Sequence, residues 1–432
     1  QHQVRPMGVQ GLLTQVRSCV QRVSLSDFSE RTLAVDASGW LHRGALVCAH
    51  ELLLGEPTDQ YLAYPLRMID LFERHGVTPL LVFDGASLPA KAAVHRARSG
   101  VRAAARARAA AAAIEADAEA ARRKTVVVTA EMARTLIEVL RARGHAFVVA
   151  PYEADAQCAF LVREGHAHAA VTDDSDLVAY GCPRVLYKLQ AGGEAELLVR
   201  DELRFAEAGG RHLFDGEREG EWREWEGGML LDMCILAGTD YLASLPQIGI
   251  AKAHAAVRRH RSLAAAARAI ARTARVGVAE ADAYVRKAQL VRLVFRHQRV
   301  YDPASGGVVS LSPTDARAVR EAVGALAPGE LDDHIGAPLP PPLDRQGCND
   351  ASHSPVSRRP YGRPFPLPDI AAQGRWAAAQ QSAPPPPTHI LASQPQPPLP
   401  PPPLPPPPPP PPSLSPTTAP LSSPHRSGRQ TR

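Results

Sequence analysis

Thr32-Leu33-Ala34-Val35-Asp36 and Leu80-Leu81-Val82-Phe83-Asp84 are two short apolar or β-branched runs that each end in an aspartate. The same plan recurs twice further along: His145-Ala146-Phe147-Val148-Val149 leads to Glu153 and Asp155, and Ala169-Ala170-Val171-Thr172 leads to Asp173, Asp174 and Asp176. Helical periodicity fills the stretches between these runs, and strands that alternate with helices are typical of a parallel sheet. The sequence therefore predicts an α/β fold with a mostly parallel central sheet flanked by helices.

Acidic residues gather at the predicted strand ends, which is where ligands bind in sheets of this kind. A further acid, Asp240, follows a predicted buried helix over 227–236. The candidate carboxylates are Asp36, Asp84, Glu153, Asp155, Asp174, Asp176 and Asp240. One acid at a strand end is usually a helix cap, but a group of carboxylates repels itself unless cations neutralise it.

Ligation by oxygen alone selects a hard cation such as Mg²⁺ or Mn²⁺ over zinc. Two such ions roughly 4 Å apart can activate a water and stabilise the leaving oxygen in phosphodiester hydrolysis. The spacings Glu153-x-Asp155 and Asp174-x-Asp176 place each pair on one side of the chain if both segments are extended. The acids thus favour two-metal phosphodiester chemistry over a set of unrelated caps.

Basic residues follow the second strand. Lys91 and Arg98 are seven residues apart and are expected to share one helix face. Only five lysines occur among the 49 basic residues, so Lys91 indicates a need for a compact ammonium group, although a surface lysine is an equal alternative. The Ala- and Arg-rich stretch 96–124 predicts one or two exposed basic helices that cover a cleft, or else a solvated surface helix.

Composition limits the remaining classes of protein. The 432 residues carry 49 basic and 44 acidic side chains, a net charge of +5 that is compatible with a polyanionic partner. No apolar run is long enough to span a membrane. The six cysteines form no CxxC pair, which indicates reduced, buried thiols rather than zinc ligands or disulfides. Residues 340–432 are rich in proline and are expected to be a disordered tail.

Six segments together resemble one known family. They are Met7-Gly8-Val9-Gln10-Gly11-Leu12-Leu13, Ala34-Val35-Asp36 with Trp40-Leu41-His42, Leu81-Val82-Phe83-Asp84-Gly85, Pro151-Tyr152-Glu153-Ala154-Asp155-Ala156-Gln157, Thr172-Asp173-Asp174-Ser175-Asp176 and Gly238-Thr239-Asp240-Tyr241-Leu242. In this order they look like the N-terminal and internal regions of the flap endonuclease superfamily of 5′ nucleases. The residues in these motifs are closer to those of its exonuclease branch than to those of its flap-cutting branch.

The resemblance implies a PIN-like nuclease core that acts as a 5′→3′ exonuclease on double-stranded DNA, with 5′-flap endonuclease activity and two Mg²⁺ ions. The seven acids become metal ligands, direct or through water, and Asp173 becomes their outward neighbour. Lys91 and Arg98 become the catalytic cations. Gly8, His42, Arg96, Gly249 and Lys252 become DNA-binding residues, the last two in a helix–two-turn–helix.

The resemblance also divides the chain into regions. We expect an N-terminal nuclease region at 7–105, a helical arch at 106–130, an internal nuclease region at 131–240, the helix–two-turn–helix with the C-terminal helical part of the core at 241–330, and the tail at 340–432. The expected setting is the nucleus, in mismatch repair or recombination. The expected partners are DNA with 5′ ends, nicks or flaps, and mismatch-repair proteins through the tail, with the chain a monomer and no membrane contact.

Several positions depart from the family pattern. Six residues precede Met7, which leaves open whether Met7 is the true start. Ser38 stands where the family has an aromatic residue, so base stacking there is in doubt. Gln247-Ile248-Gly249 replaces a Gly-Ile-Gly, and Ala237 replaces a serine, which puts K⁺ binding in question.

Two rival functions remain open at this point. One is a flap- or junction-specific endonuclease of the same superfamily. The other is a catalytically silent DNA-binding scaffold whose proline tail recruits SH3- or WW-type domains. The clustered acids argue against the scaffold, because negative charge that faces DNA weakens binding.

Overall fold

The computed structural model of the chain describes residues 8–111, 115–214, 220–313, 319, 323–324, 326–327, 329–339 and 348. Met7 and almost all of the predicted tail lie outside these residues; within the tail, only Cys348 is described, and it is buried against the core. All described residues belong to one compact unit.

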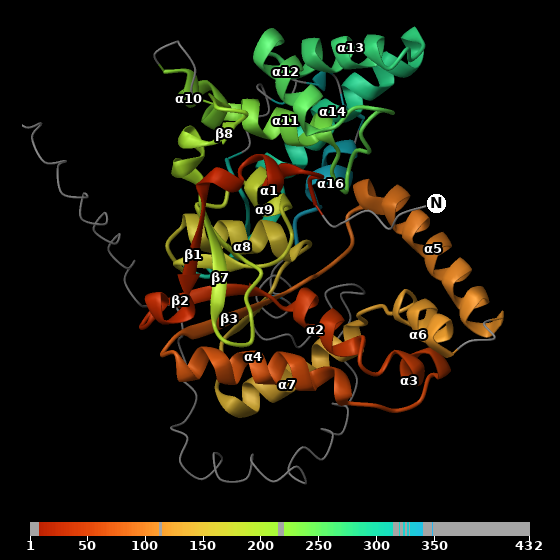
Figure 1. The fold of residues 1–432 in the computed structure, drawn as a ribbon, viewed down its shortest axis with the longest axis vertical. Coiled ribbons are helices and arrows are strands. Elements are labelled where there is room, and N and C mark those ends of the chain that lie inside the picture. Colours follow the sequence, from red (N-terminus) through yellow and green to blue (C-terminus); the bar gives the residue numbers. More distant parts are fainter. Residues whose placement is uncertain are drawn as a thin grey trace, which may run out of the picture. The chain divides into compact units, whose positions relative to one another are not determined.

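The central sheet contains seven strands among the described residues, in the order β1-β7-β6-β5-β2-β3-β4 (Figure 1). Their bounds are β1 Val20–Ser24, β2 Thr32–Asp36, β3 Thr78–Phe83, β4 Phe147–Val149, β5 Ala169–Val171, β6 Arg184–Tyr187 and β7 Glu194–Val199. Strands β6, β5, β2, β3 and β4 pair in parallel, whereas β7 pairs antiparallel with β6 and β1. The predicted mostly parallel α/β sheet is confirmed.

Helices cover both faces of the sheet, and each face has its own buried cluster. On one side lie α2 Ala37–Ala45, α4 Ala63–Arg74 and α7 Ala130–Arg143; on the other lies α8 Ala154–Arg163. The cluster under α8 continues into α9 Asp176–Ala179, α11 Leu230–Ala237 and α14 Val278–His297. Alternate residues of each strand point to opposite faces. In β2, accordingly, Leu33 and Val35 join the first cluster and Ala34 the second.

The remaining elements complete the fold. They are α1 Leu12–Gln15, α3 Ala49–Leu54, α5 Ala92–Ala111, α6 Glu115–Arg123, α10 Glu221–Glu224, α12 Ile250–His260, α13 Leu263–Thr273 and α16 Glu330–Ile335, with the hairpins β8 Glu207–Ala208 to β9 Arg211–His212 and β10 Arg299–Asp302 to β11 Gly307–Ser310. The basic stretch 96–124 thus forms parts of two helices, α5 and α6, as predicted. All six cysteines are buried.

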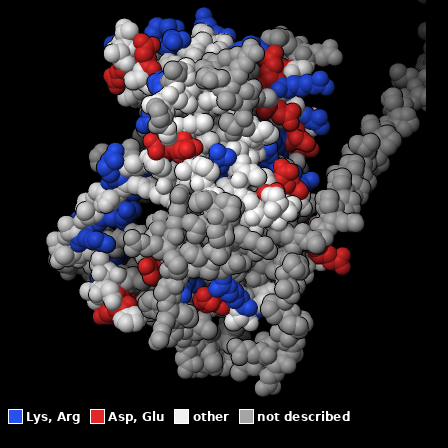
Figure 2. Space-filling model, turned by 180° about the vertical axis from the view of Figure 1, so that it is seen from behind, with Lys and Arg blue, Asp and Glu red and all other residues white. Residues whose placement is uncertain are grey.

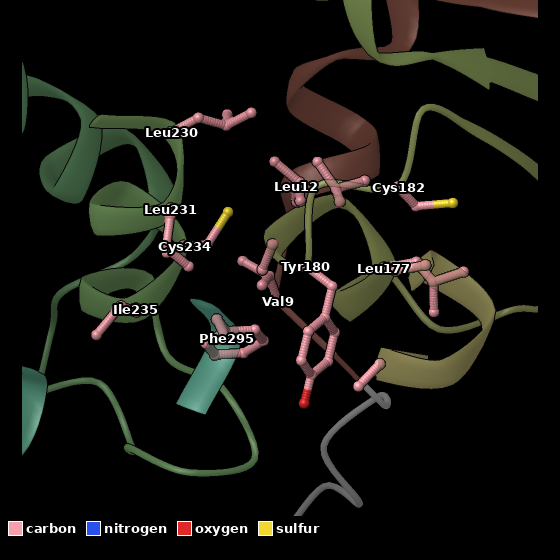
Figure 3. Packing of buried hydrophobic residues seen from close by; sticks show 14 of the residues in the cluster. Val9, Leu12, Leu177, Tyr180, Cys182, Leu230, Leu231, Cys234, Ile235 and Phe295 are labelled. Carbon is pink, nitrogen blue, oxygen red and sulfur yellow. The ribbon is translucent and has the colours of Figure 1, made fainter. Parts of the chain in front are cut away.

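Helix boundaries follow from local chemistry. The Thr129 hydroxyl accepts a hydrogen bond from the Met132 N–H and caps the start of α7, and Gly144, at φ 74°, ends that helix in a left-handed conformation. The helix predicted over 227–236 begins later, at Leu230, because a π-helical turn over Trp225–Met229 precedes it. Leu230, Leu231, Cys234 and Ile235 of α11 then pack among residues of α1, α9 and α14 (Figure 3).

No helix in the described part of the chain is both long and apolar enough to cross a membrane.

Candidate active site

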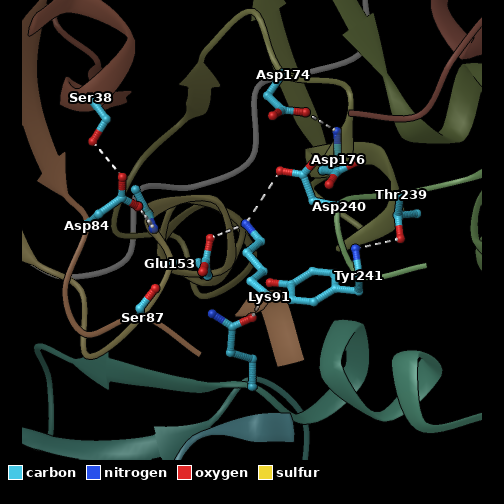
Figure 4. Close-up of polar contacts among 12 residues, drawn as sticks. Ser38, Asp84, Ser87, Lys91, Glu153, Asp174, Asp176, Thr239, Asp240 and Tyr241 are labelled. Carbon is cyan, nitrogen blue, oxygen red and sulfur yellow. Dashed lines mark hydrogen bonds and ion pairs between the residues drawn. The ribbon is translucent and has the colours of Figure 1, made fainter. Parts of the chain in front are cut away.

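Two acids stand at the carboxyl ends of the neighbouring strands β2 and β3. Asp36 ends β2 and caps α2, because its Oδ1 accepts a hydrogen bond from the Ser38 N–H at 2.9 Å. The Ser38 hydroxyl donates in turn to Asp84 Oδ2 at 2.6 Å (Figure 4). Parallel pairing places Asp36 opposite Val82, so Asp84 follows just beyond the same sheet edge. The predicted convergence of strand-end acids is therefore present for this pair.

Asp84 also connects the sheet to helix α8. Its Oδ1 accepts a hydrogen bond from the Ala154 N–H at 2.9 Å, at the first residue of that helix. Glu153 is the residue before the helix, and Asp155 lies in its first turn. The expectation of an extended Glu153-x-Asp155 segment is therefore wrong, because the backbone becomes helical between these two carboxylates.

The second acidic pair is also folded into a turn rather than extended. Asp174 Oδ1 accepts a hydrogen bond from the Asp176 N–H at 2.9 Å, where α9 begins, and the Thr172 hydroxyl accepts one from the Asp174 N–H at 3.1 Å. Both carboxylates are buried, with exposures of 8% for Asp174 and 2% for Asp176. Their neighbour Asp173 is exposed and pairs with Arg43, which agrees with its predicted outward position.

Lys91 and Arg98 meet at Asp240, in the loop after α11. The Lys91 ammonium forms an ion pair with Glu153 and lies 3.8 Å from Asp240 Oδ2 (Figure 4). Arg98 Nη2 donates to both Asp240 oxygens, at 2.9 and 2.7 Å. Lys91 ends a 3₁₀ turn, Pro89–Lys91, just before α5, and not a helix shared with Arg98. It is buried, which rules out the alternative of a surface lysine.

The cluster holds more negative charge than its own cations neutralise. Burial, with Asp84 nearby, raises the pKa of Asp36 to about 7. Burial also raises the pKa of Asp174, and burial together with neighbouring carboxylates raises the pKa of Asp155 and Asp176 well above the usual range. Burial alone would lower the pKa of Lys91, but Glu153 and other neighbours raise it well above its ordinary value.

These acids have the chemistry that a hard divalent cation needs, although they do not form a closed cage. In the part of the chain described, no three His, Cys, Asp or Glu side chains are arranged to hold a metal ion. One oxygen of Asp155 and one of Asp176, both Oδ1, are nevertheless buried without a hydrogen-bond partner. Oxygen-only donors with unneutralised charge fit Mg²⁺ or Mn²⁺.

The predicted DNA-binding residues divide into two groups. Gly8 lies against the acids: at φ 78°, a Cβ atom on it would overlap Asp174 Oδ1 and the Ser175 side chain. The other four, His42 on α2, Arg96 on α5, and Gly249 and Lys252 at the start of α12, are exposed. Arg96 makes no ion pair with an acid among the described residues, unlike Arg98 two residues later.

The hairpin before α12 keeps the expected turn but with a different residue. Gln247 adopts φ 64°, a left-handed conformation that favours glycine, at a position where the family has glycine. The Gln247 carbonyl accepts a hydrogen bond from Lys252 Nζ at 2.9 Å.

Basic side chains extend from the cluster along α5. Arg96, Arg98, Arg102, Arg106 and Arg108 all belong to this helix. The view from behind shows Lys and Arg side chains along the arm at the left that α5 forms (Figure 2). A polyanion that reaches the acids from this side would meet positive charge.

Three residues of the site were not predicted to take part in it. Ser38 links Asp36 to Asp84, Thr172 supports Asp174, and Tyr241 lies beside Lys91. The hydroxyl residue two positions before Asp174 was a readable signal, since Ser and Thr often hydrogen-bond to the backbone two residues on. The roles of Ser38 and Tyr241 depend on distant contacts that no local pattern contains.

The fold and the site are thus a mostly parallel α/β sheet with a buried, oxygen-only acid cluster and two adjoining cations. Two family models match the chain: the XPG N-terminal domain at residues 7–105 and the XPG I-region at residues 144–240. The chain belongs to the XPG/FEN superfamily, the flap endonuclease superfamily, which confirms the resemblance seen in its sequence motifs.

Several curated relatives are named exonuclease 1. The protein from Arabidopsis thaliana is 32% identical over 368 residues, which cover 84% of this chain and 47% of that protein. The Xenopus laevis protein is 34% identical over 312 residues, which cover 71% of this chain and 41% of that protein. The chain thus spans about half the length, or less, of these relatives. Among solved structures, the catalytic core of Rad2 in complex with DNA substrate (complex II) matches with a TM-score of 0.47 and 19% identity, over 78% of this chain and 92% of that one.

Proposed function

We propose that this chain is a 5′→3′ exonuclease of double-stranded DNA that also cuts 5′ flaps. One observation carries the proposal: the candidate acids come from five separate parts of the chain, yet they form one cluster. Contacts with Lys91, Arg98, Ser38 and Thr172 link most of them, and Asp155 and Asp176 are close enough to the other carboxylates for charge repulsion to raise their pKa. The similarity to exonuclease 1 proteins supports this branch of the superfamily over the flap- and junction-cutting branches.

The acids would hold two Mg²⁺ ions, or Mn²⁺ in their place. The residues in question are Asp36, Asp84, Glu153, Asp155, Asp174, Asp176 and Asp240, some of them acting through water. The chemistry expected of such ions is activation of a water and neutralisation of the leaving oxygen. Ser38 would keep the Asp36 and Asp84 carboxylates in fixed orientations, and Thr172 would hold the backbone of Asp174, through the hydrogen bonds already described.

Lys91 and Arg98 would bind the scissile phosphate. In the structure their charges are engaged by Glu153 and Asp240. Once these carboxylates are neutralised from another source, the ammonium and guanidinium groups become free for phosphate oxygens, to which both bind strongly. The arginines of α5 would guide the 5′ end toward the cluster, and Gly249 and Lys252 would hold the duplex backbone without reading its bases.

The wider setting follows from the same proposal. An enzyme of this kind would work in the nucleus, in mismatch repair or recombination, as a monomer. Residues 340–432 would contact repair proteins. A K⁺ ion at the hairpin is not part of the proposal, because Gln247 replaces the family glycine.

Cleavage of a duplex with a recessed 5′ end, labelled at that end, tests the proposal. Wild type with Mg²⁺ should release labelled mononucleotide, and EDTA should abolish the release. Asp174→Asn should also abolish it, whereas Asp173→Asn, a matched change at the exposed neighbouring acid, should retain it. Labelled oligonucleotides from a flap substrate alone would move the assignment to the flap-cutting branch. Tight DNA binding without cleavage in any divalent cation would leave only the scaffold.

A further inference from the structure

The ring of Tyr241 lies against the ammonium group of Lys91. Lys91 Nζ is 4.9 Å from the centroid of this ring, a distance at which a cation is attracted by the negative face of an aromatic system. Both residues are buried. Figure 4 shows the ring next to the Lys91 side chain.

Tyr241 is held in place independently of Lys91. Its hydroxyl is 2.9 Å from the Tyr180 hydroxyl, which donates to Gln298 Oε1 at 2.7 Å. The ring of Phe295 meets Tyr241 edge to face, with centroids 5.4 Å apart. The Tyr241 backbone N–H donates to the Thr239 hydroxyl at 3.2 Å. The ring is therefore fixed by α9, by the end of α14 and by its own loop.

Lys91 has three partners that respond differently to a divalent cation. Glu153 and Asp240 are candidate metal ligands, and a carboxylate that is already neutralised attracts an ammonium group less. An aromatic ring offers no oxygen to a hard cation. Of these three contacts, the one with Tyr241 is the one that such a cation does not compete for.

We propose that Tyr241 is a positioning residue whose ring face keeps the Lys91 ammonium in place when Glu153 and Asp240 are neutralised. This inference rests on the proposed function of Lys91. The simpler alternative is that the ring only fills space in the core, where its shape matters and its electrons do not.

Fluorination separates these alternatives, because it withdraws electron density from the ring face with little change in shape. Phenylalanine, then its mono-, di- and trifluorinated forms, would be introduced at position 241 by amber suppression. Tyr241→Phe should keep at least about one third of the wild-type cleavage rate. The fluorinated forms should lower kcat stepwise, to about ten-fold below Tyr241→Phe, with KM unchanged. In a Lys91→Met background, kcat should be the same for every member of the series.

A second measurement needs neither DNA nor cleavage. The rate of Lys91 acetylation in Mg²⁺, followed by mass spectrometry, should rise several-fold across the fluorinated series as the ammonium group becomes less well held. Lys188 is largely exposed and serves as the internal control, so its rate should stay constant.

The outcomes are distinct. Equal kcat values and equal acetylation rates across the series would reduce Tyr241 to core packing and overturn the inference. An inactive but folded Tyr241→Phe would assign the effect to the hydroxyl network instead. The same slope in the Lys91→Met background would show that Tyr241 does not act through Lys91. If wild type cleaves no DNA, the proposed function fails, and the acetylation series alone decides whether the ring holds Lys91.

Discussion

Arg98 Nη2 donates to both carboxylate oxygens of Asp240, and so joins the basic helix α5 to the loop that follows α11. Asp240 Oδ2 also lies 3.8 Å from Lys91 Nζ. A single acid therefore contacts both candidate catalytic cations, one just before α5 and one within it. Because both contacts depend on the charge of Asp240, the position of α5 is coupled to how that acid is neutralised.

Replacement of Arg98 should affect cleavage far more than stability. Arg98 is 42% exposed, so we expect Arg98→Ala to change the free energy of unfolding by less than about 1 kcal/mol. The single-turnover cleavage rate should fall about 10²-fold, the usual cost of losing one donor to a charged transition state. Denaturant unfolding and rapid-quench kinetics measure the two effects. Arg74→Ala, an exposed change on α4, is the control, and equal rates for the two variants would contradict the role of Arg98.

Removal of one buried charge should stabilise the protein when no divalent cation is present. Asp174 is buried, and burial raises its pKa. We expect Asp174→Asn to increase the free energy of unfolding in EDTA by about 1 kcal/mol, because the amide can still accept the hydrogen bond from the Asp176 N–H but carries no charge.

The same variant should lose most of the stabilisation that Mg²⁺ gives to wild type, since a ligand that binds only the folded state stabilises it. Denaturant unfolding with Mg²⁺ and with EDTA tests both effects, with Asp173→Asn as the matched surface control. An equal Mg²⁺ response in wild type and Asp174→Asn would mean that Asp174 does not contribute to a cation site.

His168 should make folding sensitive to mild acid. Burial, with Arg184 and Arg31 nearby, lowers the pKa of His168 from 6.5 to about 4. Between these values the unfolded chain binds the proton and the folded protein does not, so stability rises with pH and is lost as pH falls through this range. His168 is only partly buried, so we expect a loss of about 1 kcal/mol after solvent screening.

Denaturant unfolding across this pH range would compare wild type with His168→Gln. As pH falls, the unfolding free energy of wild type should decrease relative to that of His168→Gln. A pH-independent difference would show that the imidazole titrates alike in the folded and the unfolded state.

The sequence predicted the parallel strands β2 to β5, and the acids at their ends, from local patterns. Each of these four strands is a short apolar run, and the first acids follow such runs, as Asp36 follows Val35. Strands β1 and β7 were not predicted, because polar residues interrupt them. Parallel pairing then brings the strand ends together with no further information. Local conformation at the acids was harder to predict, because a two-residue spacing fits an extended segment and a helix start equally well. Asp155 and Asp176 turned out to lie in helices.

Long-range contacts explain the rest of what was missed. Ser38 and Asp84 are 46 positions apart, and the hydrogen bond between them exists only because β2 and β3 are neighbours. In the sequence, Ser38 was notable only because it stands where the family has an aromatic residue. Tyr241 lies within a recognised motif, but its contact with Lys91 depends on how the loop after α11 meets the turn before α5. Neither relation has a sequence signal of its own.

Gly8 and Gly11 offer a paired test of how closely the N-terminal segment approaches the acids. Both adopt a left-handed backbone, at φ 78° and φ 79°, so this conformation alone should cost alanine about 1 kcal/mol of stability at either position. A Cβ atom on Gly11 would meet only the Ile250 side chain, at 3.3 Å, whereas one on Gly8 would overlap Asp174 Oδ1. We therefore expect Gly11→Ala to cleave at near wild-type rates. Gly8→Ala should cleave at least about 10-fold more slowly and respond less to Mg²⁺, because Asp174 must move. Matching rates for the two variants would show that Asp174 can shift away from position 8 without cost, and that the close approach of Gly8 has no part in the site.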